Sequence, residues 1–565
     1  MKLTPRESQA LDSLCDTFVP SLAFGKDEDP ALFSMSANDL GVSARVADAL
    51  DIIEPAKCDG LRFFLGLLEN PLFIASVSAK ATRFSRLSQS DREGILQRLA
   101  NSVVPQLRSA YQGVRSLVML HTYAANGTPE SDALLSAIGY EPEINKKATA
   151  PRVPVVSPGS DATIECDVCV VGSGAAGSVV AAELAASGKS VIVVEAGGTW
   201  SDGDFDQHEL IGLQRLFREG GLAGTRDLSM TLLAGSSLGG GTTVNWQSCF
   251  RTPDNVREEW ARISGCRFFA TDSFTESLDA VWQHIGASTD ESEINENNGA
   301  ICRGAKSLGY SWSVIARNSL GCDAAQCGNC MFGCRVGGKQ SAATTYLMAA
   351  IRSGAQVIAP FTARKLVQSK GKVTGVEGTY SDPDGERRAL TIVAPRVVLA
   401  AGALETPALL MRSGVKSSHL GENLFLHPTV AVTATASAAR WRRHCCWRVI
   451  LIPMASRCWK MRSSCATSIT AWCLRPNCRR SVASNSISLM PAATSRTSSI
   501  RSMIPRRPKC SMLCWAALMT AKRRFSSRQR QAAQRQVFPA RRPISRQPCS
   551  GRWIMARSVR SICPI

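Results

Sequence analysis

Residues 1–150 carry apolar residues at helical spacing. The segment Thr4–Glu7 has the pattern of a capping box with proline in the first turn of a helix. Ser90–Glu93 shows a second such pattern, and another apolar run follows Pro105. The positions predicted to face a core after these three starts are Leu11, Leu14 and Phe18, then Ile95, Leu96, Leu99 and Val103, then Val114, Leu117, Val118 and Met119. The pattern predicts an all-helical N-terminal domain with a structural role.

The pattern changes after a proline-containing linker at residues 151–160. A predicted strand starts at Asp167 and is continuously apolar from Val168 to Val171, which is typical of a buried parallel strand. From there to about residue 435, glycine-rich turns alternate with apolar runs, which is typical of an α/β fold. We therefore expect a Rossmann-type nucleotide-binding domain over 160–435.

The first of these turns has the spacing of a dinucleotide fingerprint. Gly172, Gly174 and Gly177 follow the strand, a small-residue helix is predicted over Ser178–Ser187, and a second strand ends at Glu195. The glycines allow a tight turn, close approach of a pyrophosphate and close packing of helix on strand. The helix N-terminus favours the phosphates, and Glu195 is placed to accept both ribose hydroxyls. An acid there disfavours a 2′-phosphate, so FAD or NAD fits and NADP does not.

A second glycine-rich loop spans Leu238–Asn245. Together with the fingerprint, it resembles the Leu-Gly-Gly-Ser-Ser-x-x-Asn pattern of the glucose–methanol–choline (GMC) oxidoreductases. Gly239, Gly240 and Asn245 match, whereas Gly241 and Thr242 replace the serine pair. The resemblance implies contact with FAD by Gly239, Gly240, Thr242 and Asn245.

A third segment agrees with this resemblance. Arg396–Pro407 reads as a buried strand that ends in a turn of small residues, similar to the family's second signature. The resemblance implies that Ala401 and Gly402 return to the FAD. Within the family, the helical leader and the block Cys327–Cys334 resemble the long-chain fatty alcohol oxidase branch. The implied activity is FAD-dependent oxidation of the CH–OH group of long-chain alcohols, with O2 or another electron acceptor.

The cysteine block leaves two interpretations open. Cys322, Cys327, Cys330 and Cys334 have a spacing that suits zinc or an iron–sulfur cluster. Small, soft side chains also pack well in glycine-rich loops, and we favour this packing role over a metal. We therefore assign no metal ligand.

The expected base is missing from the sequence. In the resembled family, a histidine in the C-terminal third, in a context such as His-x-x-Gly-Thr, takes the hydroxyl proton. None of the six histidines has that context, and His427, which precedes proline, is interpreted as structural. The catalytic residue is therefore unknown, and a catalytically dead flavin-binding remnant is the alternative to an active enzyme.

Composition explains this gap. Residues 436–565 contain 27 Lys and Arg and neither Asp nor Glu, whereas the first 435 residues have a net charge of −7. A basic arm for nucleic acid or anionic lipid, an unfamiliar domain, and translation in a shifted reading frame compete for this tail. Excess Arg, Ser, Cys, Trp and Pro with a single glycine, Gly551, favours the frameshift. Residues 160–435 would then hold the FAD-binding domain with an inserted, incomplete substrate domain that includes the cysteine block, 436–565 would not be a native domain, and we expect little turnover.

The remaining sequence features concern the cellular location and the partners of the protein. The first twenty residues lack the apolar core of a secretory signal, and no run of eighteen apolar residues occurs. We expect a cytoplasmic protein, with peripheral membrane association left open, a small-molecule alcohol as substrate and no nucleic-acid partner.

Overall fold

The computed structural model describes residues 3–23, 33–53, 55–137, 140, 153–159, 162–226, 228, 230–322, 327–382 and 384–426. Beyond these it describes the backbone of four strands between 429 and 490. His427 and His444 lie outside the described residues, as does everything after 490.

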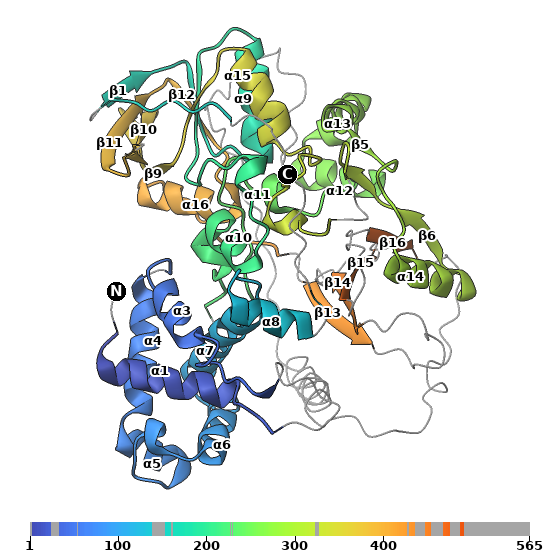
Figure 1. Ribbon diagram of the computed structural model, residues 1–565. Coiled ribbons are helices and arrows are strands. Elements are labelled where there is room, and N and C mark those ends of the chain that lie inside the picture. The colour runs from blue at the N-terminus through green and yellow to red at the C-terminus, as the bar shows by residue number, and fades with distance from the viewer. Residues whose placement is uncertain are drawn as a thin grey trace, which may run out of the picture. The chain divides into compact units, whose positions relative to one another are not determined.

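The N-terminal region is helical, as predicted (Figure 1). Its helices are α1 Pro5–Phe18, α3 Val42–Ala49, α4 Pro55–Leu68, α5 Pro71–Ser78, α6 Gln89–Ala100, α7 Pro105–Tyr123 and α8 Pro129–Ala137. The predicted capping box of α1 is confirmed, since Thr4 accepts from the backbone N–H of Glu7 and the Glu7 carboxylate accepts from that of Thr4. The prediction for α6 was wrong by two residues, because Ser88 is the N-cap. Val103 is also misplaced, because it lies in the turn before α7 and is 93% exposed.

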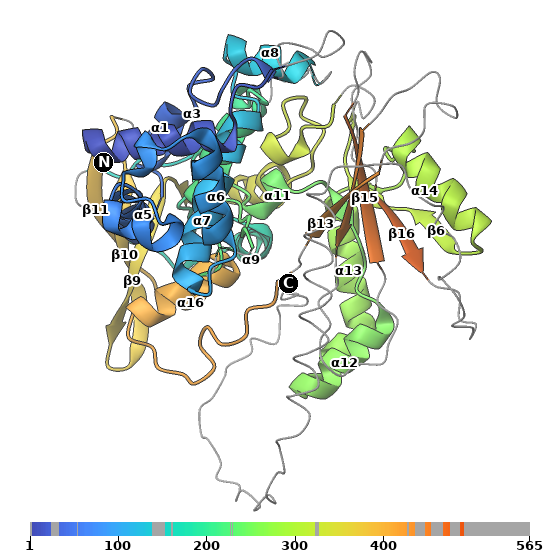
Figure 2. The same cartoon turned by 90° about the horizontal axis from the view of Figure 1, so that it is seen from below.

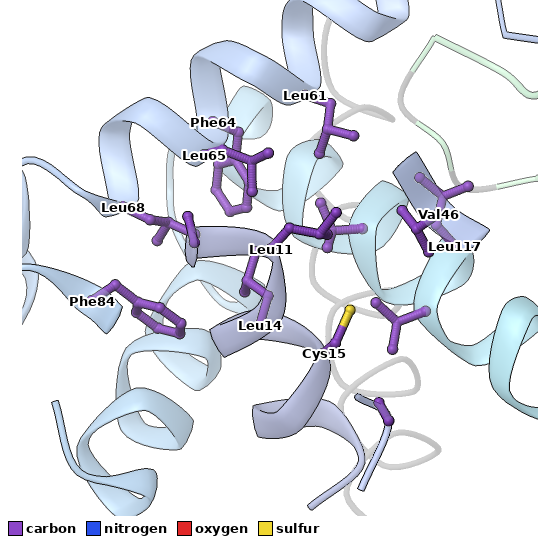
Figure 3. Close-up of a cluster of buried hydrophobic side chains, with 14 of the residues drawn as sticks. Leu11, Leu14, Cys15, Val46, Leu61, Phe64, Leu65, Leu68, Phe84 and Leu117 are labelled. Carbon is purple, nitrogen blue, oxygen red and sulfur yellow. The ribbon is translucent and has the colours of Figure 1, made fainter. Parts of the chain in front are cut away.

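One apolar core holds these helices together. Figure 3 shows side chains from α1, α3, α4 and α7, with Phe84 from a short 3-10 turn, converging on a common centre. The labelled residues are Leu11, Leu14, Cys15, Val46, Leu61, Phe64, Leu65, Leu68, Phe84 and Leu117. The helical domain is tied to α10 (Glu209–Leu216) by Glu209, whose carboxylate accepts from the Tyr140 hydroxyl and the backbone N–H of Ala125.

A four-stranded parallel sheet forms the centre of the α/β region. Its order is β12 (Arg396–Leu399), β2 (Val168–Val171), β3 (Val191–Val194) and β8 (Gln356–Ile358). The helix α9 (Ala175–Ala186) connects β2 to β3 and packs beside α15 (Met348–Arg352) (Figure 1). The predicted Rossmann-type fold is confirmed. Two details differ, because α9 starts three residues earlier than expected and β12 is an edge strand that is only half-buried.

A second sheet packs next to this one in the same core. It contains β1 (Ala162–Glu165), β11 (Arg387–Val393), β10 (Lys372–Ser381) and β9 (Phe361–Ser369), in that order. Side chains of both sheets, among them Val171, Ile192, Phe361 and Ile392, share one buried cluster. The packing of the two sheets against each other holds in place the strands whose ends carry the candidate site.

The remaining strands and helices follow the second glycine loop. A small sheet joins β4 (Ser248–Cys249), β7 (Ala316–Asn318) and β5 (Ala287–Ser288). An antiparallel sheet joins, in order, β13 Thr429–Ala434, β14 Trp447–Pro453, β15 Thr467–Leu474, β16 Ser486–Met490 and β6 Ser311–Val314. Figures 1 and 2 show β16 and β6 beside α14 (Glu296–Ser307). The other helices are α11 Gly241–Val244, α12 Asp254–Ser264, α13 Asp272–His284 and α16 Gly402–Arg412.

The described residues contain no single helix long and apolar enough to cross a bilayer. One bent pair, α4 with α5, passes that test on length and composition alone. The residues Leu61, Phe64, Leu65 and Leu68 of α4 are buried in the helical core, which accounts for its apolar composition.

Candidate cofactor site

The fingerprint glycines divide into two kinds. Gly172 has a φ of +104°, and a Cβ there would lie 2.3 Å from the carbonyl oxygen of Ala400. A Cβ on Gly177 would lie 1.9 Å from the carbonyl oxygen of Gly172. Both positions therefore require glycine for packing. A Cβ on Gly174 would approach no atom closer than 4.0 Å, so this glycine leaves open space at the N-terminus of α9.

Ser173 joins three of the predicted elements. Its hydroxyl donates to the Glu195 carboxylate at 2.8 Å and accepts from the backbone N–H of Gly239 at 3.1 Å. Its backbone N–H donates to the same Glu195 oxygen at 2.9 Å. Gly240 lies against Gly174, where a Cβ on Gly240 would be 3.0 Å from the Gly174 Cα. The fingerprint, the acid at the end of β3 and the second glycine loop thus form one structure. Sequence reasoning did not single out Ser173, although a small polar residue inside the fingerprint was a usable signal.

Glu195 is buried and already has hydrogen-bond partners. One carboxylate oxygen accepts both bonds from Ser173, and the other accepts from the backbone N–H of Gly197 at 2.9 Å. A carboxylate offers about four acceptor positions. One position therefore remains for a ribose hydroxyl, and acceptance of two hydroxyls would require one of these bonds to be exchanged.

The hydroxyls of the second glycine loop are used within the protein. Thr242 donates to the carbonyl of Gly239 at 2.6 Å and accepts from the backbone N–H of Ala342 at 2.9 Å. Thr243 donates to the carbonyl of Leu238 at 2.6 Å. Asn245 is exposed, and within the described part of the chain its side-chain oxygen accepts one bond, of 3.2 Å, from the backbone N–H of Gln247. Asn245 therefore keeps more free hydrogen-bonding capacity than Thr242.

The third predicted segment reaches the same edge of the sheet. The backbone N–H of Ala400 donates to the carbonyl of Val171 at 2.8 Å, so β12 ends beside β2. Ala401 is the N-cap of α16, and Gly402 has a φ of +77°, with open space where a Cβ would lie. The helices α9 and α16 start from adjacent parallel strands, and neither N-terminus has a side-chain cap.

These features fit a dinucleotide cofactor. Uncapped helix N-termini present backbone N–H donors and a partial positive charge to phosphates. The residues around them are exposed and small, so the backbone is open to a ligand. They are Ala175, Ala176, Gly241, Gly402 and Ala403.

The cysteine block is packed into the protein. Cys327, Cys330 and Cys334 are each 7–8% exposed, and burial raises the pKa of Cys327 to about 12. Burial raises the pKa of Cys334 as well. Among the residues that the structure describes, no three His, Cys, Asp or Glu side chains are grouped to hold a metal ion. The three cysteines are thus buried within the protein, and the choice between packing and metal binding stays a prediction.

A small cavity lies beside the second glycine loop. Its volume of about 40 Å³ has room for two or three water molecules, which is too small for an alcohol substrate or a flavin. Trp200, Asp202, Leu238, Thr243 and Lys339 contribute to its lining. Burial raises the pKa of Asp202 to about 6, against a smaller opposing effect of Lys339.

The described histidines lie in other surroundings. His121 is buried in α7, and His208 lies against Gly127. His284 stacks on Tyr346 with ring centroids 3.9 Å apart, and His419 is exposed. None of the hydrogen bonds or ring contacts of these four histidines reaches either glycine loop.

Comparison with known proteins agrees with the site. The GMC oxidoreductase family profile matches residues 213–429, and an NAD(P)-binding Rossmann-like profile matches 170–211. Among curated proteins, the chain is 30% identical to the long-chain-alcohol oxidases FAO4A and FAO3 of Arabidopsis thaliana, over 75% and 62% of its own length. It is 32% identical to the GMC-type oxidoreductase Rv0492c of Mycobacterium tuberculosis, over 63%.

The chain spans 67% of FAO4A, 52% of FAO3 and 56% of Rv0492c. Among solved structures, pyridoxine 4-oxidase from Mesorbium loti is similar with a TM-score of 0.37 and 19% identity, over 57% of this chain and 70% of that one. The sequence similarity to FAO4A, over two thirds of that protein's length, shows that the chain belongs to the GMC oxidoreductases, a family of FAD-dependent enzymes.

Proposed function

We propose that this protein carries the FAD-binding half of an oxidoreductase that acts on the CH–OH group of long-chain alcohols. The observation that supports it most is the meeting of three segments at one sheet edge. The fingerprint Gly172–Gly177, the loop Leu238–Asn245 and the turn at Ala401–Gly402 surround open backbone. The alcohol class is proposed from the similarity to FAO4A and FAO3, which are named long-chain-alcohol oxidases.

Different residues would hold different parts of the cofactor. The N–H groups at the start of α9 would face the pyrophosphate beside Gly174, and Glu195 would accept from a ribose hydroxyl. Asn245 and the turn at Ala401–Gly402 would lie against the rest of the flavin nucleotide. When bound, FAD supplies the acceptor for the hydride lost from the alcohol carbon, and O2 or another acceptor then takes the electrons.

The base that takes the hydroxyl proton belongs, in this proposal, to a C-terminal segment that the printed frame does not encode. The GMC family profile ends at residue 429, close to where the composition changes. A catalytically inactive flavin-binding remnant is the second candidate. The surroundings of His121, His208, His284 and His419 favour it for the chain as printed.

The test is anaerobic reduction of the flavin-loaded protein by dodecan-1-ol, with dodecane as the matched control that lacks the hydroxyl. A chain with the C-terminal frame restored should lose its oxidised-flavin absorbance with the alcohol only. The printed chain should react about 10²–10⁴-fold more slowly, the usual contribution of a general base. If neither chain reacts with the alcohol while both bind FAD, the oxidoreductase proposal is wrong and the remnant is supported.

A further inference from the structure

Lys339 is a buried lysine whose amine donates hydrogen bonds to three backbone carbonyls. Its side chain is 3% exposed. The Nζ atom donates to the carbonyls of Thr243 at 2.8 Å, Asn245 at 2.7 Å and Cys330 at 2.7 Å. These bonds use all three donors of an ammonium group. Burial lowers the pKa of Lys339, and its amine forms no salt bridge with a carboxylate of the described residues.

Two of these carbonyls terminate the second glycine loop. Thr243 lies in the last turn of α11, and Asn245 is its C-cap. Carbonyls at a helix end have no partner within the helix, so these two carbonyls need donors from elsewhere. Lys339 supplies them, and through Cys330 it joins the loop to the cysteine block. The backbone N–H of Lys339 also donates to the Cys334 sulfur at 3.3 Å.

The backbone just beyond the loop is held in an unusual conformation. Gln247 is fully buried with a φ of +64°, which a non-glycine residue adopts at a cost. Its side-chain oxygen accepts from Arg317 at 2.6 Å and from the Ser319 hydroxyl at 2.8 Å. The loop is therefore fixed near its start by Ser173 and at its end by Lys339, while Arg317 holds Gln247, two residues beyond the loop.

We propose that Lys339 is a positioning residue for the flavin, which it serves by holding the loop Leu238–Asn245 against the fingerprint. This inference rests on the proposed FAD site. Lys339 acts through its hydrogen bonds to the carbonyls of Thr243 and Asn245. The cysteine block, in this view, is the anchor from which the lysine reaches the loop.

The test compares Lys339→Met with Arg257→Met. Arg257 is the matched control, because it is also buried and donates to backbone carbonyls, those of Phe269 at 3.0 Å and Thr271 at 2.9 Å, away from the glycine loops. FAD affinity is measured by quenching of flavin fluorescence. We expect Lys339→Met to weaken FAD binding about 10- to 100-fold, the scale of one or two unpaired buried carbonyls, and Arg257→Met to change it less than threefold.

Hydrogen exchange gives a readout that does not need the cofactor. Amides of residues 238–247 should exchange at least about tenfold faster in Lys339→Met, while those of the strands β2 and β3 stay as in the wild type. If the wild type binds no FAD, the proposed function fails, but this measurement still tests the role of Lys339. Unchanged exchange of 238–247 would overturn the inference, as would FAD affinity within threefold of the wild type.

A second variant covers failure of Lys339→Met to fold. Lys339→Gln keeps a polar side chain with fewer donors and no charge. Its FAD affinity should lie below that of the wild type, with faster exchange confined to residues 238–247. Wild-type affinity and exchange in Lys339→Gln would show that the ammonium group is not needed, and the inference would be abandoned.

Discussion

Replacement of Gly177 by alanine tests the close contact between α9 and the fingerprint turn. The new methyl would lie 1.9 Å from the carbonyl oxygen of Gly172 and 3.2 Å from the Ala400 Cβ. Ordinary contact begins near 3.4 Å, so the helix and the turn must part by about 1.5 Å. The oxygen belongs to the backbone and cannot swing aside as a side chain would. The substitution should therefore displace the N-terminus of α9.

The expected loss of stability is the difference between two opposing contributions. Overpacking costs about 1–3 kcal/mol, and a clash with rigid backbone lies toward the upper end. Alanine in a helix returns up to about 1 kcal/mol relative to glycine. A net loss of about 2 kcal/mol should lower the Tm by about 4–8 °C. A displaced N–H that loses one bond to a phosphate weakens FAD binding about 10- to 150-fold, from about 1.5–3 kcal/mol per charge-assisted bond.

Gly174→Ala is the matched control for this substitution. Its methyl has 4.0 Å of clearance, and the residue has a φ of −66°, so the fold should accept it. The Tm should fall by less than half as much as in Gly177→Ala, yet FAD affinity should fall because the methyl enters the space facing the pyrophosphate. Calorimetry gives the Tm, and fluorescence titration gives the affinity. Wild-type Tm and affinity in Gly177→Ala would refute the reasoning.

Three further predictions concern the acid, a buried histidine and the reading frame. Glu195→Gln should weaken FAD binding about 10- to 100-fold in fluorescence titration, because an amide nitrogen would face N–H donors of Ser173 or Gly197; unchanged affinity would contradict the assigned role. Burial, and to a lesser extent Arg45, lowers the pKa of His121 from 6.5 to about 4. As the pH falls from 6.5 to 4, His121 therefore becomes protonated in the unfolded state but not in the folded state, which favours unfolding. Denaturant unfolding should therefore show that the wild type loses up to about 3 kcal/mol more free energy of unfolding than His121→Phe over that pH range. Parallel pH dependence of the two proteins would refute this prediction. The raised pKa of Asp202 has the opposite effect on stability, but equally in both proteins. Sequencing of the coding DNA across codons 420–445 should reveal another frame that restores acidic residues, a His-x-x-Gly-Thr-like stretch and a terminal Asn-Pro, whereas three frames without these features would leave the printed tail as the true sequence.

The sequence predicted the elements whose signal is local. The capping box at Thr4, the fingerprint glycines and the strand before them each depend on a few neighbouring residues, and the structure contains them as expected. The start of α6 was misplaced because Ser88 and Ser90 are both plausible N-caps, and only the bond from the Asp91 N–H to the Ser88 hydroxyl decides between them. A local sequence pattern was therefore enough to locate an element where only one residue was a candidate for its cap or turn.

What the sequence could not give depends on contacts between distant segments. Ser173 meets Gly239, and Lys339 reaches Thr243 across 96 positions of the chain. Neither contact produces a periodic pattern in the sequence. The free capacity of Thr242 and Glu195 was overestimated for a different reason. Ala342 and Gly197, which donate to them, do so through backbone N–H groups that carry no side-chain signature.

The most direct test of the site is a titration of the purified chain with FAD, followed by competition with ADP. The proposed site predicts saturable binding of one FAD per chain that ADP displaces, because the fingerprint and Glu195 would face the ADP half of the cofactor. FMN, which lacks that half, should not displace it. Absence of saturable FAD binding, or displacement by FMN but not by ADP, would contradict the assignment of Gly172–Gly177 and Glu195 as the nucleotide site.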